Sequence, residues 1–383
     1  MAMKIVLAFD SFKGSLRSNE VADAFEEGVR TVIPDCEITK AHIADGGEGT
    51  MSAISQSLNG AVTEMCVKGP TGKPVMARYA TIDNGRTALV EMAEASGLTL
   101  LEEKDRNPLL TSTYGTGELI ADALRKGCRK FIVGIGGSAT NDGGAGLLRA
   151  LGFRFLDENG NALDGRGKDL KDIRHIDESE VMCGVKGSEF IIACDVTNPL
   201  YGPNGAAYVF APQKGADAQM AELLDSGLKN LAEVITRHNG IVVDDLPGGG
   251  AAGGMGAGMY GLLNAQLKRG IEVVLDTMRF DNMLEGCDLV VTGEGCIDSQ
   301  TLMGKAPIGV LQRASAKNIP VVAIGGEVRL CRELERTGFK EIVSINDKGL
   351  PKEKAMQRSI AYDNVKRAGE SIALRYATSS SRK

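Results

Sequence analysis

Short apolar segments alternate with amphipathic helical patterns along most of this chain. Several of the segments lack polar alternation, which is typical of strands that are covered on both faces of a sheet. The segments between them place apolar side chains at helical spacing on one stripe. Because this alternation is characteristic of parallel sheets, it predicts an α/β fold. The expected strands are Lys4–Phe9, Ile38–Ala44, Thr87–Met92, Phe131–Gly134, Phe190–Cys194, Asp288–Thr292, Val321–Ile324 and Glu341–Ile345, and the expected helices are Ser18–Val32, Thr116–Lys126, Met259–Lys268, Ile308–Lys317 and Cys331–Thr337.

The middle of the chain has a different pattern. Residues Ala61–Val67 and Met76–Ile82 carry polar alternation on both sides of the turn signal Gly69–Gly72, which indicates antiparallel strands with one exposed face. After about residue 285 the regular strand–helix rhythm returns. We therefore expect the N-terminal strand and the C-terminal block to share one sheet, with the middle inserted as a second α/β domain. The predicted domains are residues 1–80 plus 285–383, and residues 81–284.

Composition narrows the classes of function. The 383 residues include 44 Lys or Arg and 50 Asp or Glu, a formal charge of 44 − 50 = −6, and no Trp. A mildly acidic chain with no basic block and few aromatic side chains predicts no nucleic-acid and no membrane partner. No apolar run approaches the ~20 residues of a membrane span, and the N-terminus has no signal-peptide pattern. The eight Cys form no CxxC pair and the three His lie in no metal motif, so we expect a cytoplasmic protein with reduced thiols.

Carboxylates follow four of the predicted strands. Asp10, the segment Asp45–Glu48, Asp195 and Glu294 each come just after an apolar run. Taken alone, each acid is better explained as the cap of a following helix. However, the carboxyl ends of parallel strands meet at one edge of a sheet, and ligands bind there. Four such acids, two of them among glycines, therefore favour a functional site.

Two glycine-rich segments are the stronger signal. Glycine accounts for 49 residues, many of them in Gly134–Gly146 and Pro247–Gly258. Glycines allow consecutive N–H groups to converge on an anion, and Ser138 and Thr140 add hydroxyl donors in the first segment. Tight packing of helices would explain one such segment. Two of them in one chain suggest that it binds a polyphosphate.

The first segment leaves two kinds of enzyme open. Gly134-x-Gly136-x-x-Ala139 matches the dinucleotide fingerprint, with Asp157 as the acid that follows, and so favours an NAD(P)-dependent oxidoreductase of a small hydroxy acid. Against this, Asp142 would repel a pyrophosphate unless a metal intervened. Carboxylates, glycine-rich loops and a few lysines are instead what phosphoryl transfer requires. The residues favour a small-molecule kinase without the Walker A and protein-kinase motifs. A sensor that binds its ligand without turnover also stays open.

Seven segments form a recognisable series: Asp10–Ser15, Ala44–Thr50, Ser112–Glu118, Gly134–Gly146, Cys194–Leu200, Gly293–Thr301 and Gly304–Val310. In this order, from Met3 to about Arg375, they resemble the signature segments of the bacterial glycerate kinase family. The resemblance implies ATP-dependent phosphorylation of D-glycerate with Mg²⁺. Its closest relatives imply 2-phosphoglycerate as the product, although some of the wider family make the 3-phosphate. It also implies a flavodoxin-like domain with a second domain inserted into it. We expect the active site in the cleft between the two domains. It stays open whether identical chains assemble into a homo-oligomer.

Two positions depart from the family pattern. Phe9 stands where Pro is usual, and Cys296 stands where the pattern Gly-Glu-Gly-Arg places Arg. An arginine there would bind a carboxylate or a phosphate, and cysteine cannot replace its charge. Either Lys13, Lys305 or Arg329 takes over this role, or the substrate preference has changed.

The candidate residues receive roles as hypotheses. Asp195 is expected to be the base for the glycerate hydroxyl, with Lys13 as a second catalytic residue and Asn198 as a metal or phosphate partner. Asp142 is expected to hold Mg²⁺, directly or through water. The phosphate-binding candidates are Gly136, Gly137, Ser138 and Thr140, with Gly250, Gly253 and Gly254 as a second cradle. The acceptor-site candidates are Lys13, Ser15, Asp45 and Glu48, and Glu294 and Asp298 fit either half of the site.

Overall fold

The computed structural model describes residues 3–43 and 50–380, and the chain divides into two compact units. Unit 1 combines Met1–Asp45 with Ile271–Lys383, and unit 2 is Gly46–Gly270. Both boundaries lie earlier in the chain than the predicted ones. Residues 61–82 belong to unit 2 because their strands pair with its sheet. Residues 271–284 belong to unit 1, where Arg313 Nη1 pairs with the carboxylate of Asp281 at 2.6 Å.

The sheet of unit 1 is parallel throughout. β1 (Lys4–Phe9) lies between β2 (Glu37–His42) and β11 (Leu289–Ile297), and β12 (Val321–Val328) and β13 (Glu341–Ser344) follow. The order β2-β1-β11-β12-β13 is flavodoxin-like, which confirms the predicted fold class and the shared sheet. The strand order changes direction between β1 and β11. Ligands of such sheets bind at the carboxyl ends of the strands at this point.

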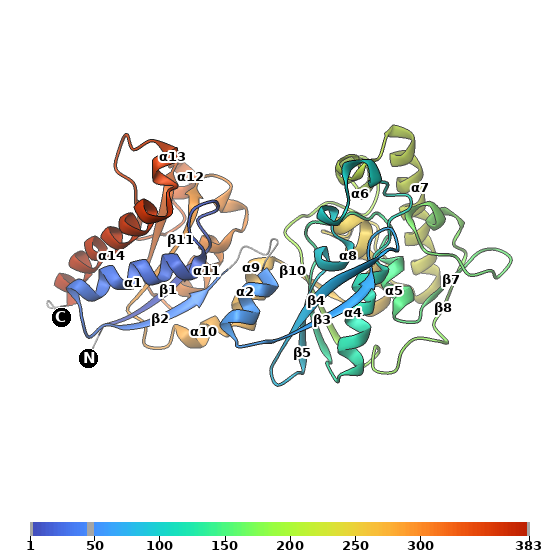
Figure 1. Cartoon of the computed structure of the whole chain (residues 1–383), viewed down its shortest axis with the longest axis horizontal. Helices are drawn as coiled ribbons and strands as arrows, with labels where there is room; N and C mark the ends of the chain where they lie inside the picture. The colour runs from blue at the N-terminus through green and yellow to red at the C-terminus, as the bar shows by residue number, and fades with distance from the viewer. Residues whose placement is uncertain (1–2, 44–49, 381–383) are drawn as a thin grey trace. The chain divides into compact units, whose positions relative to one another are not determined.

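Helices cover the sheet of unit 1. α1 (Ser18–Val32) has the predicted bounds and packs along α14 (Arg358–Ser380) (Figure 1). Phe25 of α1 contacts Phe9 of β1, with ring centroids 5.5 Å apart. The apolar stripe that predicted α1 is therefore the face that the helix buries. A further helix, α11 (Ala306–Ala316), packs against β11 and β12.

The sheet of unit 2 is mixed. Four strands run parallel, and a hairpin of two antiparallel strands completes one edge, as predicted for the middle of the chain. The register of the parallel strands places Glu91, Gly134 and Ala193 side by side at the carboxyl edge. In sheet order the strands are β10 (Gln266–Lys268), β9 (Glu189–Ala193), β6 (Lys130–Gly134), β5 (Thr87–Glu91), β4 (Pro74–Ile82) and β3 (Ala61–Lys68).

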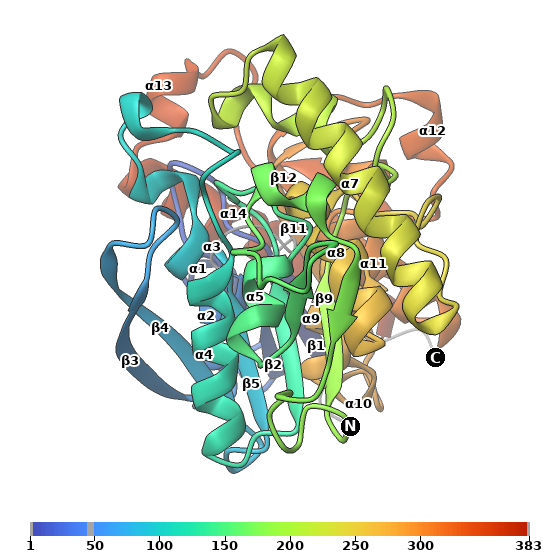
Figure 2. The ribbon, with the colours of Figure 1, turned by 90° about the vertical axis from the view of Figure 1, so that its right-hand side faces the viewer.

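Helices pack on this sheet and on each other. Figure 2 shows α4 (Tyr114–Arg125) beside β5, where it also contacts α5 (Ala145–Ala150). The predicted helix Met259–Lys268 is wrong in its bounds, because α8 is Ala251–Leu263 and the last three predicted residues form β10. Asn264 has a φ of 53°, a left-handed conformation that ends the helix.

The remaining elements complete the two units. None of the helices in the described part of the chain is long and apolar enough to cross a membrane. The elements not named above are α2 (Thr50–Ser57), α3 (Ala93–Ser96), β7 (Arg154–Leu156), β8 (His175–Asp177), α6 (Ala206–Phe210), α7 (Ala218–Asn239), α9 (Gly270–Thr277), α10 (Phe280–Met283), α12 (Arg332–Glu335) and α13 (Lys352–Ala355).

Candidate active site

A cavity of about 730 Å³ opens in unit 1 where the strand order changes direction. Asp10 follows β1, and its N–H donates to the Gly293 carbonyl of β11 at 2.9 Å. The volume is in the range of pockets that hold drug-sized ligands. Its lining includes three of the predicted site residues, Lys13, Ser15 and Glu294.

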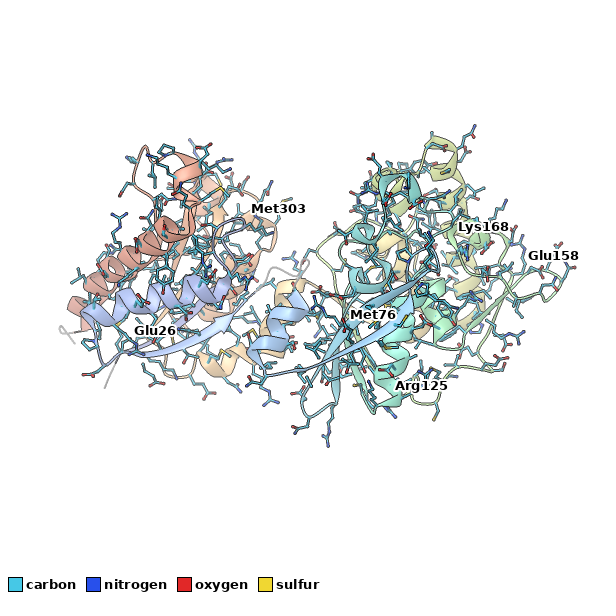
Figure 3. All side chains as sticks on the ribbon, in the orientation of Figure 1. Glu26, Met76, Arg125, Glu158, Lys168 and Met303 are labelled. Atoms are coloured by element: carbon cyan, nitrogen blue, oxygen red, sulfur yellow. The ribbon has the colours of Figure 1, made fainter. Side chains whose placement is uncertain are left out.

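Glu294 is fixed in the wall of this cavity. It is 6% exposed, and both carboxylate oxygens have partners. Thr301 Oγ1 donates to Oε1 at 2.6 Å, and Lys305 Nζ lies 3.1 Å from Oε2. Both partners come from the segment between β11 and α11, in which Met303 is exposed to solvent (Figure 3). The ion pair therefore holds Lys305 at the cavity and offsets the charge of Glu294.

Ser15 brings an unused hydroxyl to the cavity. It follows Gly14, whose φ of 79° forms the turn in which the backbones of Phe12 and Leu16 pair. Ser15 Oγ is buried, and the described residues give it no hydrogen-bond partner. Buried hydroxyls normally have a partner, so this atom is available to a ligand. The geometry supports a place for Ser15 in a binding site.

The charges around the cavity suit a small anion. Five cations stand against four carboxylates, a balance of 5 − 4 = +1. Burial raises the pKa of the Cys296 thiol, so this side chain stays neutral, and it cannot supply the positive charge of an arginine. Lys13, Lys305 and Arg329, the three cations that could replace the arginine of the family pattern, all line the cavity. The cations are Lys13, Lys305, Arg329, Lys348 and Lys352, and the carboxylates are Asp10, Glu294, Glu327 and Asp347.

In unit 2, the loop after β6 forms an open turn at residues 136–138. Backbone hydrogen bonds hold both sides of it: the Leu98 N–H donates to the Gly137 carbonyl at 2.8 Å, and the Ala139 N–H to the Ser96 carbonyl at 2.9 Å. Gly137 has a φ of 70°, and a Cβ on Gly136 would meet nothing within 4 Å. Within the described residues, the N–H groups of 136, 137 and 138 make no hydrogen bond. Three available N–H groups at an exposed turn can bind an oxyanion.

A buried lysine that the sequence analysis missed contacts this loop. Lys214 ends the short helical turn Pro212–Lys214 and is 1% exposed. Its Nζ donates to Ser138 Oγ and to the Thr140 carbonyl, each at 2.7 Å. Burial lowers the pKa of Lys214 to about 7, although the charge of Asp142 opposes this. The available sequence signal is weak: Lys214 is the one cation between residues 199 and 228.

Asp142 acts as an anchor inside the same loop. It is fully buried, and it accepts hydrogen bonds from the Thr113 N–H at 2.7 Å and from Thr113 Oγ1 at 2.9 Å. The N–H groups of Gly144 and Gly146 donate to it at 3.1 and 3.3 Å. Burial raises the pKa of its carboxyl group, and this effect outweighs the hydrogen bonds, which lower the pKa. Both oxygens are engaged by the protein, so the geometry gives no support to the prediction that Asp142 holds Mg²⁺.

The second glycine-rich segment packs against the first. A Cβ on Gly253 would lie 2.1 Å from the Thr140 carbonyl oxygen, and one on Gly250 would lie 2.2 Å from the Pro199 carbonyl oxygen. A Cβ on Gly254 would lie 2.7 Å from a leucine side chain. These glycines are buried because protein atoms already fill the space beside them. The structure thus gives Gly250, Gly253 and Gly254 a packing role, and their predicted role as a phosphate cradle gains no support.

The carboxyl edge of the unit 2 sheet also carries two carboxylates. Asp195 follows β9, is exposed, and accepts a hydrogen bond from the Gly270 N–H at 2.9 Å. Glu91, which the sequence analysis did not single out, ends β5 and accepts from the Met51 N–H at the start of α2 at 2.9 Å. Because β5, β6 and β9 are parallel neighbours, both acids share an edge with the 136–138 turn.

The structure does not test the binding roles predicted for four further residues, Asp45, Glu48, Asn198 and Asp298. Asp45 and Glu48 lie outside the described residues, so their place at the acceptor site stays a prediction. Asn198 Nδ2 donates to a backbone carbonyl at 2.9 Å, and Asp298 Oδ1 accepts from the Gln300 N–H at 2.9 Å. Across residues 3–43 and 50–380, no three His, Cys, Asp or Glu side chains are grouped to hold a metal.

The dinucleotide interpretation does not fit the geometry. In that motif the helix starts at the turn, and the pyrophosphate lies at its N-terminus. Here α5 begins only at Ala145, well after Gly136. Asp157 follows β7, which pairs antiparallel with β8 in a separate two-stranded sheet. The acid is therefore not at the end of the neighbouring parallel strand, as the motif requires.

The α/β fold of both units, the cavity of unit 1 and the open glycine turn of unit 2 are typical of enzymes that bind small anions and phosphate groups. The chain belongs to the glycerate kinase family, whose model matches residues 5–377. It is 44% identical to the glycerate kinase of Bacillus subtilis (strain 168) and to the glycerate 2-kinase of Escherichia coli (strain K12), over 372 residues and 97% of each chain. A crystal structure from Salmonella typhimurium LT2, of a protein described as a provisional glycerate kinase 2, matches with a TM-score of 0.89 and 44% identity over 100% of both chains. The chain is thus a phosphotransferase with an alcohol acceptor, and glycerate is the small molecule that it phosphorylates.

Proposed function

We propose that the enzyme transfers the terminal phosphoryl group of ATP to the 2-hydroxyl of D-glycerate, giving 2-phosphoglycerate and ADP. The observation that carries the choice of hydroxyl is the 44% identity to the Escherichia coli glycerate 2-kinase over 97% of both chains. A kinase family implies a nucleoside triphosphate as the donor, and ATP is the donor that we propose.

The 136–138 turn of unit 2 is the proposed site for phosphate groups of the nucleotide. Its available N–H groups are donors, and phosphate oxygens are acceptors only. Thr140 Oγ1 and both polar atoms of the Asn141 side chain are buried, and no described residue hydrogen-bonds to them. Such atoms are rare in folded proteins and fit a ligand or water that completes the site. The residues present therefore suit a polyphosphate.

The cavity of unit 1 is the proposed site for glycerate. Lys305, held by Glu294, and Arg329 can pair with the carboxylate of the substrate, which supplies the charge that Cys296 lacks. Ser15 Oγ can bond to a hydroxyl group of the substrate. The cavity is larger than a three-carbon acid needs, so room remains for water or for part of the second substrate.

Asp195 is the proposed general base. The hydrogen bond from the Gly270 N–H orients its carboxylate at the sheet edge. The carboxylate accepts the proton of the 2-hydroxyl while that oxygen forms its bond to phosphorus, and the bond between phosphorus and the bridging oxygen of ADP breaks. One proton moves to Asp195 and one phosphoryl group moves to glycerate.

Mg²⁺ is proposed to arrive with the nucleotide. In nucleotide sites this ion is held by one or two carboxylates together with phosphate oxygens and water, and it neutralises charge on the phosphates. Asp142, its predicted ligand, is engaged inside the loop. No described residue is therefore assigned to the metal, and no step of the reaction is derived from it.

A coupled assay of ADP release tests the proposal. We expect turnover with D-glycerate, and much less with L-glycerate or hydroxypyruvate. Phosphorus NMR of the product should show 2-phosphoglycerate. Absence of ADP release with D-glycerate would contradict the proposed reaction, and a 3-phosphoglycerate signal would contradict the choice of hydroxyl.

A further inference from the structure

The ammonium group of Lys214 is buried among neutral acceptors. The side chain is 1% exposed, and its two hydrogen-bond acceptors are a serine hydroxyl and a peptide carbonyl. Burial of a charge is costly unless the charge is paired with an opposite one. A neutral apolar side chain of similar length would fill the same space without this cost. The position of this ammonium therefore needs an explanation beyond packing.

The backbone around Lys214 is built to bring the side chain to this position. Gly215 follows with a φ of 95°, and a Cβ on it would lie 2.4 Å from the Arg106 carbonyl oxygen. Only glycine allows this close approach with this conformation. Both acceptors of Nζ lie in the loop whose N–H groups at 136–138 are available. Lys214 thus contacts the same loop that presents donors at its open turn.

We propose that Lys214 is a positioning residue for phosphate binding: it holds Ser138 and Thr140 in place and supplies the positive charge of the site at the 136–138 turn. This inference rests on the proposed function, because it assigns the turn to phosphate. An anion bound at the turn would add a second opposite charge to that of Asp142, which alone does not offset the burial of the ammonium. Phosphate binding and the charge of Lys214 would then stabilise each other.

Two other charged residues lie in segments that pack near Lys214. Asp142, in the loop after β6, raises its pKa by attraction. Arg106 packs through its backbone on Gly215, and its Nε is buried with no partner among the described residues. Burial outweighs the attraction of Asp142 and lowers the pKa of Lys214 to about 7. A bound phosphate should raise it again, so binding just above neutral pH should take up a proton.

Calorimetry of Lys214→Met tests the proposal without relying on turnover. The probes are MgADP and inorganic tripolyphosphate, each titrated in two buffers of different ionisation enthalpy. We expect the wild-type chain to take up a fraction of a proton per ligand slightly above pH 7. Lys214→Met should bind about 10- to 100-fold more weakly, as for the loss of a charged hydrogen-bond donor, and should bind without this uptake. Its thermal midpoint should be equal or higher, because a buried charge is removed.

Two further variants distinguish a positioning role of Lys214 from a general role in the stability of the fold. Ser138→Ala removes one of the two acceptors of Nζ, so its effect on binding should be strongly non-additive with that of Lys214→Met. Lys186→Met is the control, since Lys186 is an exposed lysine of unit 2 that precedes β9 at the opposite end of the sheet from the turn. It should bind both probes like the wild type.

Wild-type affinity of Lys214→Met for both probes, or wild-type binding without proton uptake, would overturn the proposal. If Lys214→Met fails to fold, the proton uptake of the wild-type chain decides alone. The proposed function fails separately, through absence of ADP release with D-glycerate while the probes still bind. Absence of probe binding to the wild type would instead remove the phosphate site itself.

Discussion

Lys214 Nζ donates a 2.7 Å hydrogen bond to Ser138 Oγ, between residues that are 76 positions apart in the chain. Both side chains are buried, so the bond joins the Pro212–Lys214 turn to the loop after β6 in a region with little water. In such surroundings a charged donor binds its acceptor strongly but is expensive to keep charged. We therefore expect the loop to be sensitive to pH and to bound anions.

The stability of the fold should depend on pH through Lys214. Its pKa is about 7 in the folded chain, against an ordinary value of 10.5. Between these values the unfolded chain binds more protons, so the folded state gains stability as pH rises from about 7 and loses it as pH falls back toward 7, below which both states are protonated and the effect levels off. In urea unfolding, the difference in free energy between wild type and Lys214→Met should increase with pH by at most about 1.4 kcal/mol per unit. A difference that is constant with pH would show that Lys214 titrates normally.

Asp195→Asn should lower kcat by about 10²- to 10⁴-fold, because the amide cannot accept the proton of the hydroxyl. The amide oxygen can still accept the hydrogen bond from the Gly270 N–H, so the KM for the nucleotide should change little. Steady-state kinetics with D-glycerate measures both constants. Asp172→Asn, at an exposed acid of unit 2, serves as the control. Near-normal turnover of Asp195→Asn would remove the assignment of Asp195 as the base.

Asp142→Asn should destabilise the fold by about 1–3 kcal/mol, because the amide NH₂ group faces N–H donors where an oxygen accepted their hydrogen bonds. Chemical unfolding measures this loss. The Mg²⁺ concentration at half-maximal activity should stay the same if Asp142 is only an anchor of the loop. A large shift in this Mg²⁺ requirement, with unchanged stability, would restore the role of metal ligand that the sequence predicts.

Gly253→Ala should be far more destabilising than Gly240→Ala. Both glycines have positive φ, 69° and 80°, so both substitutions incur about 1–2 kcal/mol of backbone strain. At Gly253 the new Cβ would also lie 2.1 Å from the Thr140 carbonyl oxygen, whereas nothing lies within 4 Å at Gly240. The clash should add at least about 1–3 kcal/mol. Equal unfolding midpoints for the two variants would mean that the two glycine-rich segments do not pack as described.

Lys305→Met should weaken glycerate binding and leave Glu294 buried without its cation. The pair is only partly enclosed, because the Lys305 side chain is 31% exposed, so the expected loss of stability is about 1–3 kcal/mol. The KM for D-glycerate should rise more than the KM for ATP. The control is Lys340→Met, at an exposed lysine of unit 1. A selective rise in the KM for ATP would assign this cavity to the nucleotide instead.

Local patterns predicted much of the fold. The helix Ser18–Val32 and the strand Lys4–Phe9 have the bounds that the sequence predicts, because an apolar stripe and a buried run are properties of neighbouring residues. The unit boundaries were predicted too late in the chain. The sequence shows that residues 61–82 form antiparallel strands, but it does not show which sheet they join.

The candidate site was predictable in chemistry but not in geometry. Ser15 and Glu294 were chosen for their place after strands, and they line one cavity. Asp142 was chosen because it lies in the first glycine-rich segment, where a metal would be needed beside a phosphate, yet its hydrogen bonds come from Thr113 and from the loop itself. A carboxylate looks the same in a sequence whether it faces a ligand or ties a loop together.

The sequence by itself determined the family, the parallel strand–helix architecture and the kinds of groups that handle phosphate, because these follow from short motifs and from periodicity. Only the tertiary structure decided which glycines present N–H groups at an open turn and which, like Gly253, pack closely on another segment. It alone revealed Lys214, whose partners are 74 and 76 positions away. The physical reason is that burial and hydrogen bonding depend on what lies across a contact, and long-range partners leave no local pattern in the chain.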